Sequence, residues 1–297
     1  MKKIITLMLM LFSIGIFAVE PIEIIVPRSP GGANDIFARR AAESLTDILK
    51  QEVIVVNKPG ADGLIAFKYA QERPNNRIVM YSSGAVASEV LNPNIGYSYT
   101  NVNIVAPILT GSAVFFVGKK SNINTFAEFV ERARKQNINC ASASPSFTLI
   151  QNHLYNTLKL KNVRVILYKG TAEAALAVAS GDVDCMLDTT DVIIELVKSK
   201  KLKVLAAPHL AKEWPNAITF NQINNFNYPG IYWLGLGVLQ SADPNIRDYL
   251  LDGIRQLSSD SKFKFSMSRG YDISIVKPKD QKFINDNFKF YQDAAIQ

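Results

Sequence analysis

The chain has 297 residues, of which 48% are hydrophobic and 20% are charged, and its formal net charge is +7. This composition excludes disordered and fibrous proteins, and the length exceeds what one hydrophobic core usually organises, so we expect two lobes. The charge excess is modest, and the densest basic run, residues 198–203, is expected to be the solvated end of a helix. Nucleic acid is therefore not an expected partner.

The N-terminus predicts export. Lys2 and Lys3 precede an apolar run, in MKKIITLMLMLFSIGIFA, that is shorter than a membrane-spanning helix requires. We expect a signal peptide at residues 1–18, with cleavage after Gly15 as the competing position. No Cys follows the apolar run to accept a lipid, so the mature protein is expected to be soluble and periplasmic.

Strand-like and helical patterns alternate along the rest of the chain. Strand-like runs are centred near Ile24, Val53, Ile78, Val114, Ile138, Val165, Met186, Val204 and Leu236. Helical spacing of apolar residues occurs at residues 34–50, 125–136, 147–160 and 171–180, after Pro244, and near the C-terminus. The alternation predicts an α/β fold with mostly parallel sheets flanked by helices.

Two crossings between the lobes are expected, at Ala113–Gly118 and Tyr232–Leu239. They divide the chain into lobe 1, residues 19–118 plus 232–297, and lobe 2, residues 119–231. In the last helical segment Phe283, Ile284, Phe288 and Tyr291 share one face, which is expected to pack on a lobe of the same chain.

Two glycine turns carry the first functional signal. Gly31 and Gly32 separate a strand from a helical pattern in IIVPRSPGGANDIFARR, and Gly60 and Gly63 do the same in VIVVNKPGADGLIAFKYA. Glycine lets the backbone bend and lets a ligand approach the N–H groups at the positive end of a helix. One such turn could serve turn geometry alone, but two together predict a small anion held by main-chain donors without a charged side chain.

Cysteines and histidines are too few for a metal centre. Cys140 and Cys185 lie in short apolar runs, where two buried free thiols are favoured over a bridge between parallel strands. His153 and His209 are the only histidines, and no paired cysteine spacing accompanies them. The sequence therefore predicts neither a metal nor a cofactor.

The ordered set of segments resembles the receptors of tripartite tricarboxylate transporters, also called Bug-type solute-binding proteins. The matching segments are VPRSPGGANDIFARRAAESL, VVNKPGADGLIAFKYA, ASPSFTLIQNHL, YKGTAEAALAVASGDVDCMLD and WLGLGVLQSADP. The resemblance implies a two-lobed, type II periplasmic-binding-protein fold with a ligand cleft between the lobes. It also implies a small carboxylate ligand, hinge closure, delivery to integral-membrane transporter subunits and no enzymatic activity; we expect a monomer.

In the first lobe the resemblance implies that one carboxylate is held by Gly31, Gly32, Asn34, Gly60 and Gly63, partly through ordered water. Asp35 matches the family's helix-start acid and is expected to cap free N–H groups and organise the loop. Ser83 and Gly84 follow a strand and fall at the carboxyl edge of the parallel strands, where ligand loops gather, and Ser83 is taken as a further candidate.

In the second lobe the implied contacts are Ser144, Ser146, Thr148, Tyr168, Gly170 and Thr171. The hydroxyl groups could bond the ligand or cap a helix. Asp188 follows an apolar strand and could likewise contact an amino or hydroxyl group of the ligand or cap the next helix. Two positions depart from the family pattern: the Asp62 carboxylate would oppose a bound carboxylate unless it points away, pairs or selects different cargo, and Pro145 removes a backbone donor.

Two other functions remain open. A ligand-sensing subunit of a membrane kinase needs the same closing cleft, so the sequence does not separate it from a transport receptor. An exported hydrolase is disfavoured, because no G-x-S-x-G motif occurs and His153 lies at helical spacing in QNHLYNTL.

Overall fold

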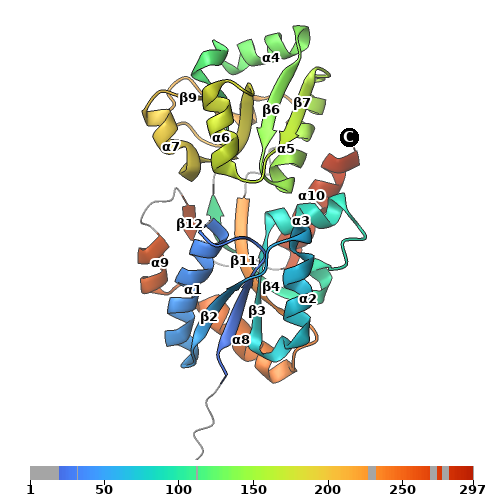
Figure 1. Ribbon diagram of the computed structural model, residues 1–297, viewed down its shortest axis with the longest axis vertical. Helices are drawn as coiled ribbons and strands as arrows, with labels where there is room; N and C mark the ends of the chain where they lie inside the picture. Colours follow the sequence, from blue (N-terminus) through green and yellow to red (C-terminus); the bar gives the residue numbers. More distant parts are fainter. Residues whose placement is uncertain are drawn as a thin grey trace, which may run out of the picture.

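The computed structural model describes residues 20–31, 33–111, 113–226, 232–267, 273–275 and 281–296. Two six-stranded sheets flanked by helices form two lobes, one above the other in Figure 1. The predicted signal peptide at residues 1–18 and the predicted site residue Gly32 lie outside the described residues. Within the described ranges, every helix is too short or too polar to cross a membrane.

Lobe 1 contains the sheet β12-β4-β11-β3-β1-β2. Its strands are β1 (Ile22–Val26), β2 (Val53–Asn57), β3 (Arg77–Ser82), β4 (Val102–Gly111), β11 (Tyr232–Leu239) and β12 (Ile273–Ile275). Its helices are α1 (Ala33–Leu49), α2 (Leu64–Glu72), α3 (Ser83–Leu91), α8 (Pro244–Gln256), α9 (Ser261–Met267) and α10 (Gln281–Ile296). β1 runs parallel to β2 and β3, whereas β11 runs antiparallel to β3 and β4.

Lobe 2 contains the sheet β10-β9-β5-β8-β6-β7. Its strands are β5 (Ala113–Gly118), β6 (Ile138–Ser142), β7 (Val163–Leu167), β8 (Cys185–Thr189), β9 (Leu202–Ala207) and β10 (Ile218–Thr219). Its helices are α4 (Phe126–Lys135), α5 (Pro145–Thr157), α6 (Thr171–Ser180) and α7 (Thr190–Lys198). β6 runs parallel to β7 and β8, and β5 runs antiparallel to β8 and β9.

The predicted α/β fold is confirmed: most strands of each sheet run in one direction, and β5 and β11 run antiparallel to both of their neighbours. One boundary differs from the prediction, because the segment Ala113–Gly118, expected in lobe 1, is a central strand of the lobe 2 sheet. The reversed direction of β5 and β11 has one cause: a strand that enters a sheet from the other lobe starts at the edge where the parallel strands end, so it must run the opposite way.

Alternate residues of the central strands supply two apolar layers. On β3, Ile78 and Met80 face a cluster under α1, α8 and α9, while Val79 and Tyr81 face a cluster under α2 and α3. The second of these clusters continues into lobe 2, where Phe115 of β5 packs against α4. The cores of the two lobes are therefore joined on one side of the molecule.

The join is a packed seam of α3, α5 and α10. Helix α10 contacts α3 of lobe 1 and α5 of lobe 2, and Figure 1 shows it running along both lobes. Tyr291 of α10 is 1% exposed, and its hydroxyl interacts with those of Ser83 in lobe 1 and Ser146 in lobe 2. Burial raises the pKa of Tyr291, and the hydrogen bonds with Ser83 and Ser146 lower it in part. The C-terminal helix thus packs on both lobes rather than on one.

Asp35 fixes the turn that leads into α1. Its buried carboxylate accepts hydrogen bonds from the Gly31 N–H, Arg39 Nε and Asn57 Nδ2, each at 2.9 Å. Asn57 Nδ2 also lies 3.0 Å from the backbone oxygen of Arg28, which ties the turn to β2. Burial acts to raise the pKa of Asp35, but the hydrogen bonds from Arg39, Gly31 and Asn57 together lower it below its ordinary value.

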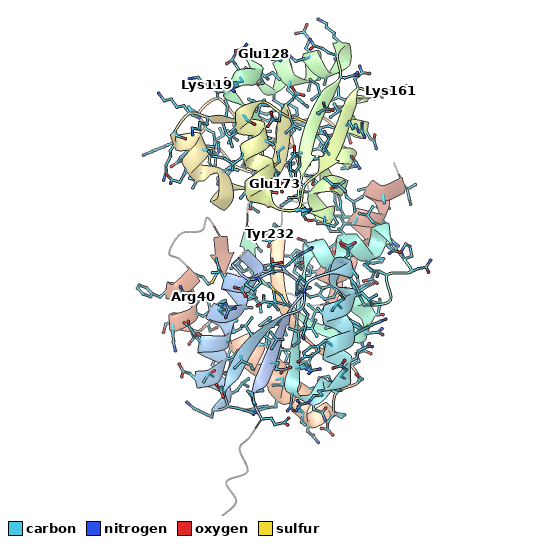
Figure 2. All side chains as sticks on the ribbon, viewed as in Figure 1. Arg40, Lys119, Glu128, Lys161, Glu173 and Tyr232 are labelled. Carbon is cyan, nitrogen blue, oxygen red and sulfur yellow. A yellow bond between two sulfur atoms is a disulfide. The ribbon has the colours of Figure 1, made fainter. Side chains whose placement is uncertain are left out.

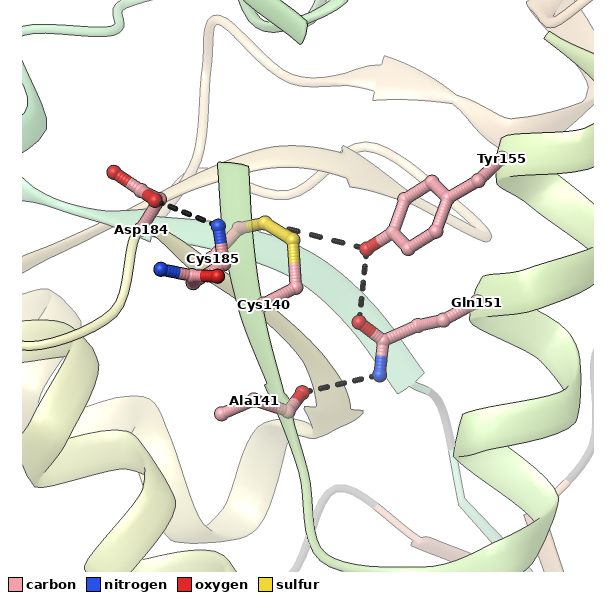
Figure 3. The surroundings of a disulfide bond; sticks show 7 residues. Cys140, Ala141, Gln151, Tyr155, Asp184 and Cys185 are labelled. Atoms are coloured by element: carbon pink, nitrogen blue, oxygen red, sulfur yellow. Dashed lines mark hydrogen bonds between the residues drawn. A yellow bond between two sulfur atoms is a disulfide. The ribbon is translucent and has the colours of Figure 1, made fainter. Parts of the chain in front are cut away.

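A disulfide joins Cys140 of β6 to Cys185 of β8 (Figure 3). The two residues are direct partners in the parallel register, with Cα atoms 4.4 Å apart. This corrects the expectation of two free thiols, because direct pairing on one face brings the sulfur atoms together. Beside the bond, the Tyr155 hydroxyl lies 4.0 Å from Cys185 Sγ and donates to Gln151 Oε1 at 2.9 Å, and Gln151 Nε2 donates to the Ala141 oxygen.

Asp35→Asn is expected to lower the free energy of unfolding by about 1–2 kcal/mol near neutral pH, because an amide replaces a charged acceptor. Since the pKa of Asp35 is depressed in the folded state, its contribution is present above the unfolded value near 3.8 and is lost as pH falls through the folded value. Urea unfolding of both proteins from neutral pH into acid checks this, and the two stabilities should converge in acid. A difference that is constant with pH would contradict it.

Reduction of the disulfide is expected to lower the free energy of unfolding by about 2–4 kcal/mol, because the bond closes a loop with a sequence separation of 45 residues. Urea unfolding with and without dithiothreitol measures the change, and a thiol titration shows that the bond has been reduced. The control is the double variant Cys140→Ala with Cys185→Ala, whose unfolding midpoint should not respond to dithiothreitol. An unmoved midpoint in the reduced wild type would refute a stabilising role.

Candidate functional site

The carboxyl ends of the parallel strands of both lobes face the junction between them. In Figure 1, β1, β2 and β3 run up toward lobe 2, and β6 and β7 run down toward lobe 1. Figure 2 shows Tyr232, the first residue of β11, at this junction, with Glu173 of α6 above it. The loops and helix starts that follow these strands therefore meet at one place, as ligand loops do in open α/β sheets.

On the lobe 1 side, a small cavity opens between the ends of β1 and β3. Its lining includes Arg28, Asp62, Gly63, Ser82 and Tyr97. The Tyr97 hydroxyl donates to the backbone oxygen of Asp62 at 2.9 Å, which fixes the second glycine loop. Burial raises the pKa of Tyr97, and the negative charge of Asp62 adds to the rise.

Both glycines of the second loop have positive φ angles, 117° for Gly60 and 105° for Gly63. A Cβ on Gly60 would lie 2.8 Å from Ile65 Cδ1, so this glycine serves the turn itself. Gly63 lines the cavity and donates its N–H to the Gly60 oxygen at 3.1 Å. Of the two, Gly63 is the one placed beside the junction.

On the lobe 2 side, hydroxyl groups cluster at the start of α5. Ser144 precedes the helix without capping it, and its Oγ lies 2.8 Å from Ser146 Oγ. Thr148 Oγ1 donates to the Ser144 oxygen at 3.0 Å and lies 2.9 Å from Ser142 Oγ. Pro145 occupies the first turn, where its missing N–H leaves no helical hydrogen bond unmade.

The start of α6 and the end of β8 lie together beside this cluster. Thr171 Oγ1 donates to Asp188 Oδ2 at 3.3 Å, and the Thr189 N–H donates to Asp188 Oδ1 at 2.7 Å. Asp188 is 2% exposed, so it joins these two segments from within the lobe. A Cβ on Gly170 would meet nothing within 4 Å, so the approach to the start of α6 is open.

Tyr168 contributes to two different regions of lobe 2. Its backbone N–H donates to the Ser142 oxygen at 2.8 Å, which links the ends of β6 and β7. Its side chain lines a groove along α6 together with Leu176 and Lys119. The ring of Tyr168 therefore lies apart from the hydroxyl cluster at the start of α5.

The two lobes approach each other beside Gly84, the second residue of α3. The position that a Cβ would take on Gly84 lies 3.5 Å from Ser82 Oγ, 3.8 Å from Ser144 Oγ and 3.9 Å from Arg28 Nη2. A methyl group on Gly84 would therefore touch a hydroxyl of lobe 2, a hydroxyl of lobe 1 and a guanidinium.

Further predicted site residues are engaged in the protein's own structure. The N–H of Gly31 is bound by Asp35, and Asn34 Oδ1 accepts a hydrogen bond from the Tyr232 hydroxyl at 3.0 Å. Ser83, expected at the ligand, is 0% exposed; its Oγ lies 3.5 Å from the Trp233 nitrogen and interacts with Tyr291. Ser146 is likewise buried at the seam.

Arg28 is a junction residue that sequence reasoning missed, whereas that reasoning places Gly84 beside Ser83 at the carboxyl edge of the parallel strands but selects only Ser83 as a site residue. A signal for Arg28 was present, since it stands between the first strand and the first glycine turn. Gly84 directly follows Ser83, and choosing between neighbours at a helix start requires the actual direction of each side chain. His153, the histidine that a hydrolase would need, packs on α5 against the rings of Phe226 and Phe290.

Known proteins match this chain along most of its length. A family model described as the tripartite tricarboxylate transporter family receptor matches residues 37–295. A UPF0065 protein of Bordetella pertussis is 29% identical over 175 residues, which are 57% of this chain and 54% of that relative. The alignment therefore spans about half the length of that relative.

Two solved structures have a similar fold. MatC of Rhodopseudomonas palustris with bound malate superposes with a TM-score of 0.77 at 18% identity, covering 94% of this chain and 99% of that one. A second R. palustris protein, solved with adipate, has the same TM-score at 19% identity and covers 93% of this chain and 96% of that one. Because the family model matches far more than half of its sequence, this chain belongs to the family of tripartite tricarboxylate transporter receptors.

Proposed function

We propose that this protein is a periplasmic receptor that captures a small carboxylate between its lobes, closes around it and delivers it to a membrane transporter. The observation that carries the proposal is the meeting of helix starts from both lobes beside Gly84. A helix start supplies free N–H groups and a partial positive charge, so two that face one point form a site suited to an anion. Family membership and two similar folds solved with malate and with adipate support a carboxylate as the anion.

The mechanism is binding without bond making or breaking. The ligand contacts lobe 1 through the loops around Gly63 and Ser82 and lobe 2 through the starts of α5 and α6, near Ser144 and Gly170. Because these contacts are complete only when the lobes approach, the ligand stabilises the closed form by its differential affinity. The closed form then presents a surface that the transporter distinguishes from the empty receptor.

A screen of mono-, di- and tricarboxylates, amino acids and nicotinate by thermal shift is expected to single out one class of carboxylate. A ligand at 100 times its Kd stabilises the folded state by about 2.7 kcal/mol, which raises the unfolding temperature measurably. Isothermal titration then gives the affinity and a stoichiometry of one. If no carboxylate raises the unfolding temperature, the proposed function is wrong.

Gly84→Ala is expected to weaken binding of the acid found in that screen by at least about tenfold while leaving the fold intact. The added methyl group would make ordinary van der Waals contacts with Ser82, Ser144 and Arg28, so it fits the empty protein, and alanine is compatible with a helix. It fills the space between the lobes, however, where the proposal places the ligand. Titration measures the affinity and urea unfolding measures the stability. If the variant binds the acid as tightly as the wild type does, the ligand does not bind beside Gly84.

A further inference from the structure

Arg28 lies at the centre of the junction. It follows the end of β1 by two residues, and its backbone oxygen is held by Asn57 Nδ2. Its Nη2 atom lies 3.9 Å from the position that a Cβ on Gly84 would take, and Ser144 Oγ lies 3.8 Å from the same position. The guanidinium therefore extends from the first strand of lobe 1 to the start of α3 and faces the start of α5 in lobe 2.

The Arg28 guanidinium takes part in no ion pair and no side-chain hydrogen bond with any part of the chain that the structure describes. Other arginines of lobe 1 are paired: Arg39 Nε lies 2.9 Å from Asp35 Oδ2, and Arg77 Nε lies 2.7 Å from Glu23 Oε2. Arg28 is also exposed to solvent. Its charge is thus available to a ligand and is not committed to the fold.

The surroundings of Arg28 favour an anion over a neutral group. The starts of α3 and α5 both point at the same space, and the hydroxyls of Ser82 and Ser144 can donate there. The Asp62 carboxylate lines the same cavity as Arg28. Both groups also act on the Tyr97 phenol, where burial, Glu89 and Asp62 raise the pKa and Arg28 lowers it.

We infer that Arg28 forms an ion pair with a carboxylate of the ligand and is the residue that makes this receptor select anions by charge. The inference rests on the proposed function, since it assigns a partner to the ligand of that same site. A guanidinium offers a planar pair of donors that matches the two oxygens of a carboxylate, and lysine supplies the charge without that geometry. Losing such a pair weakens binding about tenfold or more.

Isothermal titration with malate and with adipate tests the assignment on the wild type, Arg28→Gln, Arg28→Lys and Lys161→Gln. Lys161 is exposed at the far side of lobe 2 in Figure 2, so its substitution changes the net charge equally but away from the junction. For the acid that binds the wild type, Arg28→Gln is expected to reduce affinity at least about tenfold, Arg28→Lys by less, and Lys161→Gln by less than about twofold.

The salt dependence of the binding affinity distinguishes a direct charge interaction from a purely structural role of Arg28. Between about 20 mM and about 300 mM NaCl the affinity of the wild type should fall, and in Arg28→Gln this fall should flatten. Unfolding temperatures equal to that of the wild type show that the variants are folded, as expected for a side chain without structural contacts. Wild-type affinity and salt dependence in Arg28→Gln would overturn the assignment but leave the receptor function standing. A wild type that binds neither these acids nor any carboxylate of the screen would overturn both.

Discussion

The seam of α3, α5 and α10 is the constraint on which the rest of the structure depends. Tyr291 places one phenol between a hydroxyl of lobe 1 and a hydroxyl of lobe 2, inside an apolar cluster that runs through both lobes. Helices α3 and α5 begin at the junction and are part of this seam, so the seam fixes how the two helix starts face each other. In the described residues α1 and α6, on the other side, share no comparable packing. For the proposed closure, the seam is therefore the natural pivot, and the α1 and α6 side is the part that opens.

The same arrangement gives the residues of the first loop different roles. Asp35 binds the N–H of Gly31 and pairs with the charge of Arg39, which holds the turn rigid but removes both groups from the ligand. The N–H of Gly31 is thus a structural donor in this protein. Among the described residues at the end of β1, the guanidinium of Arg28 has no side-chain partner, so the anion site that we propose combines main-chain donors with one cation.

Sequence patterns predicted the elements whose two faces differ. Helices α1 and α4 each have a clear apolar face, so the spacing of their apolar residues predicted them. Helix α3 was missed because most of its residues, including Ser83, Gly84 and Glu89, are buried, which removes the contrast between faces. β4 was missed because Asn103 and Pro107 interrupt its apolar run. The carboxyl-edge rule predicted the place where the helix starts meet, but the choice between Ser144 and the more buried Ser146, and between Gly84 and Ser83, needed the positions of their atoms in space.

Three features lay beyond any single segment. The direction of β5 follows from where the chain enters the second sheet, and the pairing of Cys140 with Cys185 follows from register between strands that are 45 residues apart in sequence. The proposed role of Arg28 depends on the starts of α3 and α5 lying beside each other in the folded protein. Each feature is a property of two segments together, and periodicity within one segment carries no information about it.

The Asp62 carboxylate and the Arg28 guanidinium line the same cavity, and their opposite charges affect how an anion would bind there. The positive φ of Asp62, 51°, is maintained by the turn between Gly60 and Gly63, and the Tyr97 hydroxyl holds its backbone oxygen, so the residue is fixed at the cavity wall. Alone, its carboxylate would repel a bound carboxylate across a few ångströms. Arg28 on the same wall offsets that repulsion and leaves the donors of α3 and α5 to add net attraction. Without the guanidinium the cavity would carry an uncompensated negative charge, and a site for anions there would be electrostatically unfavourable.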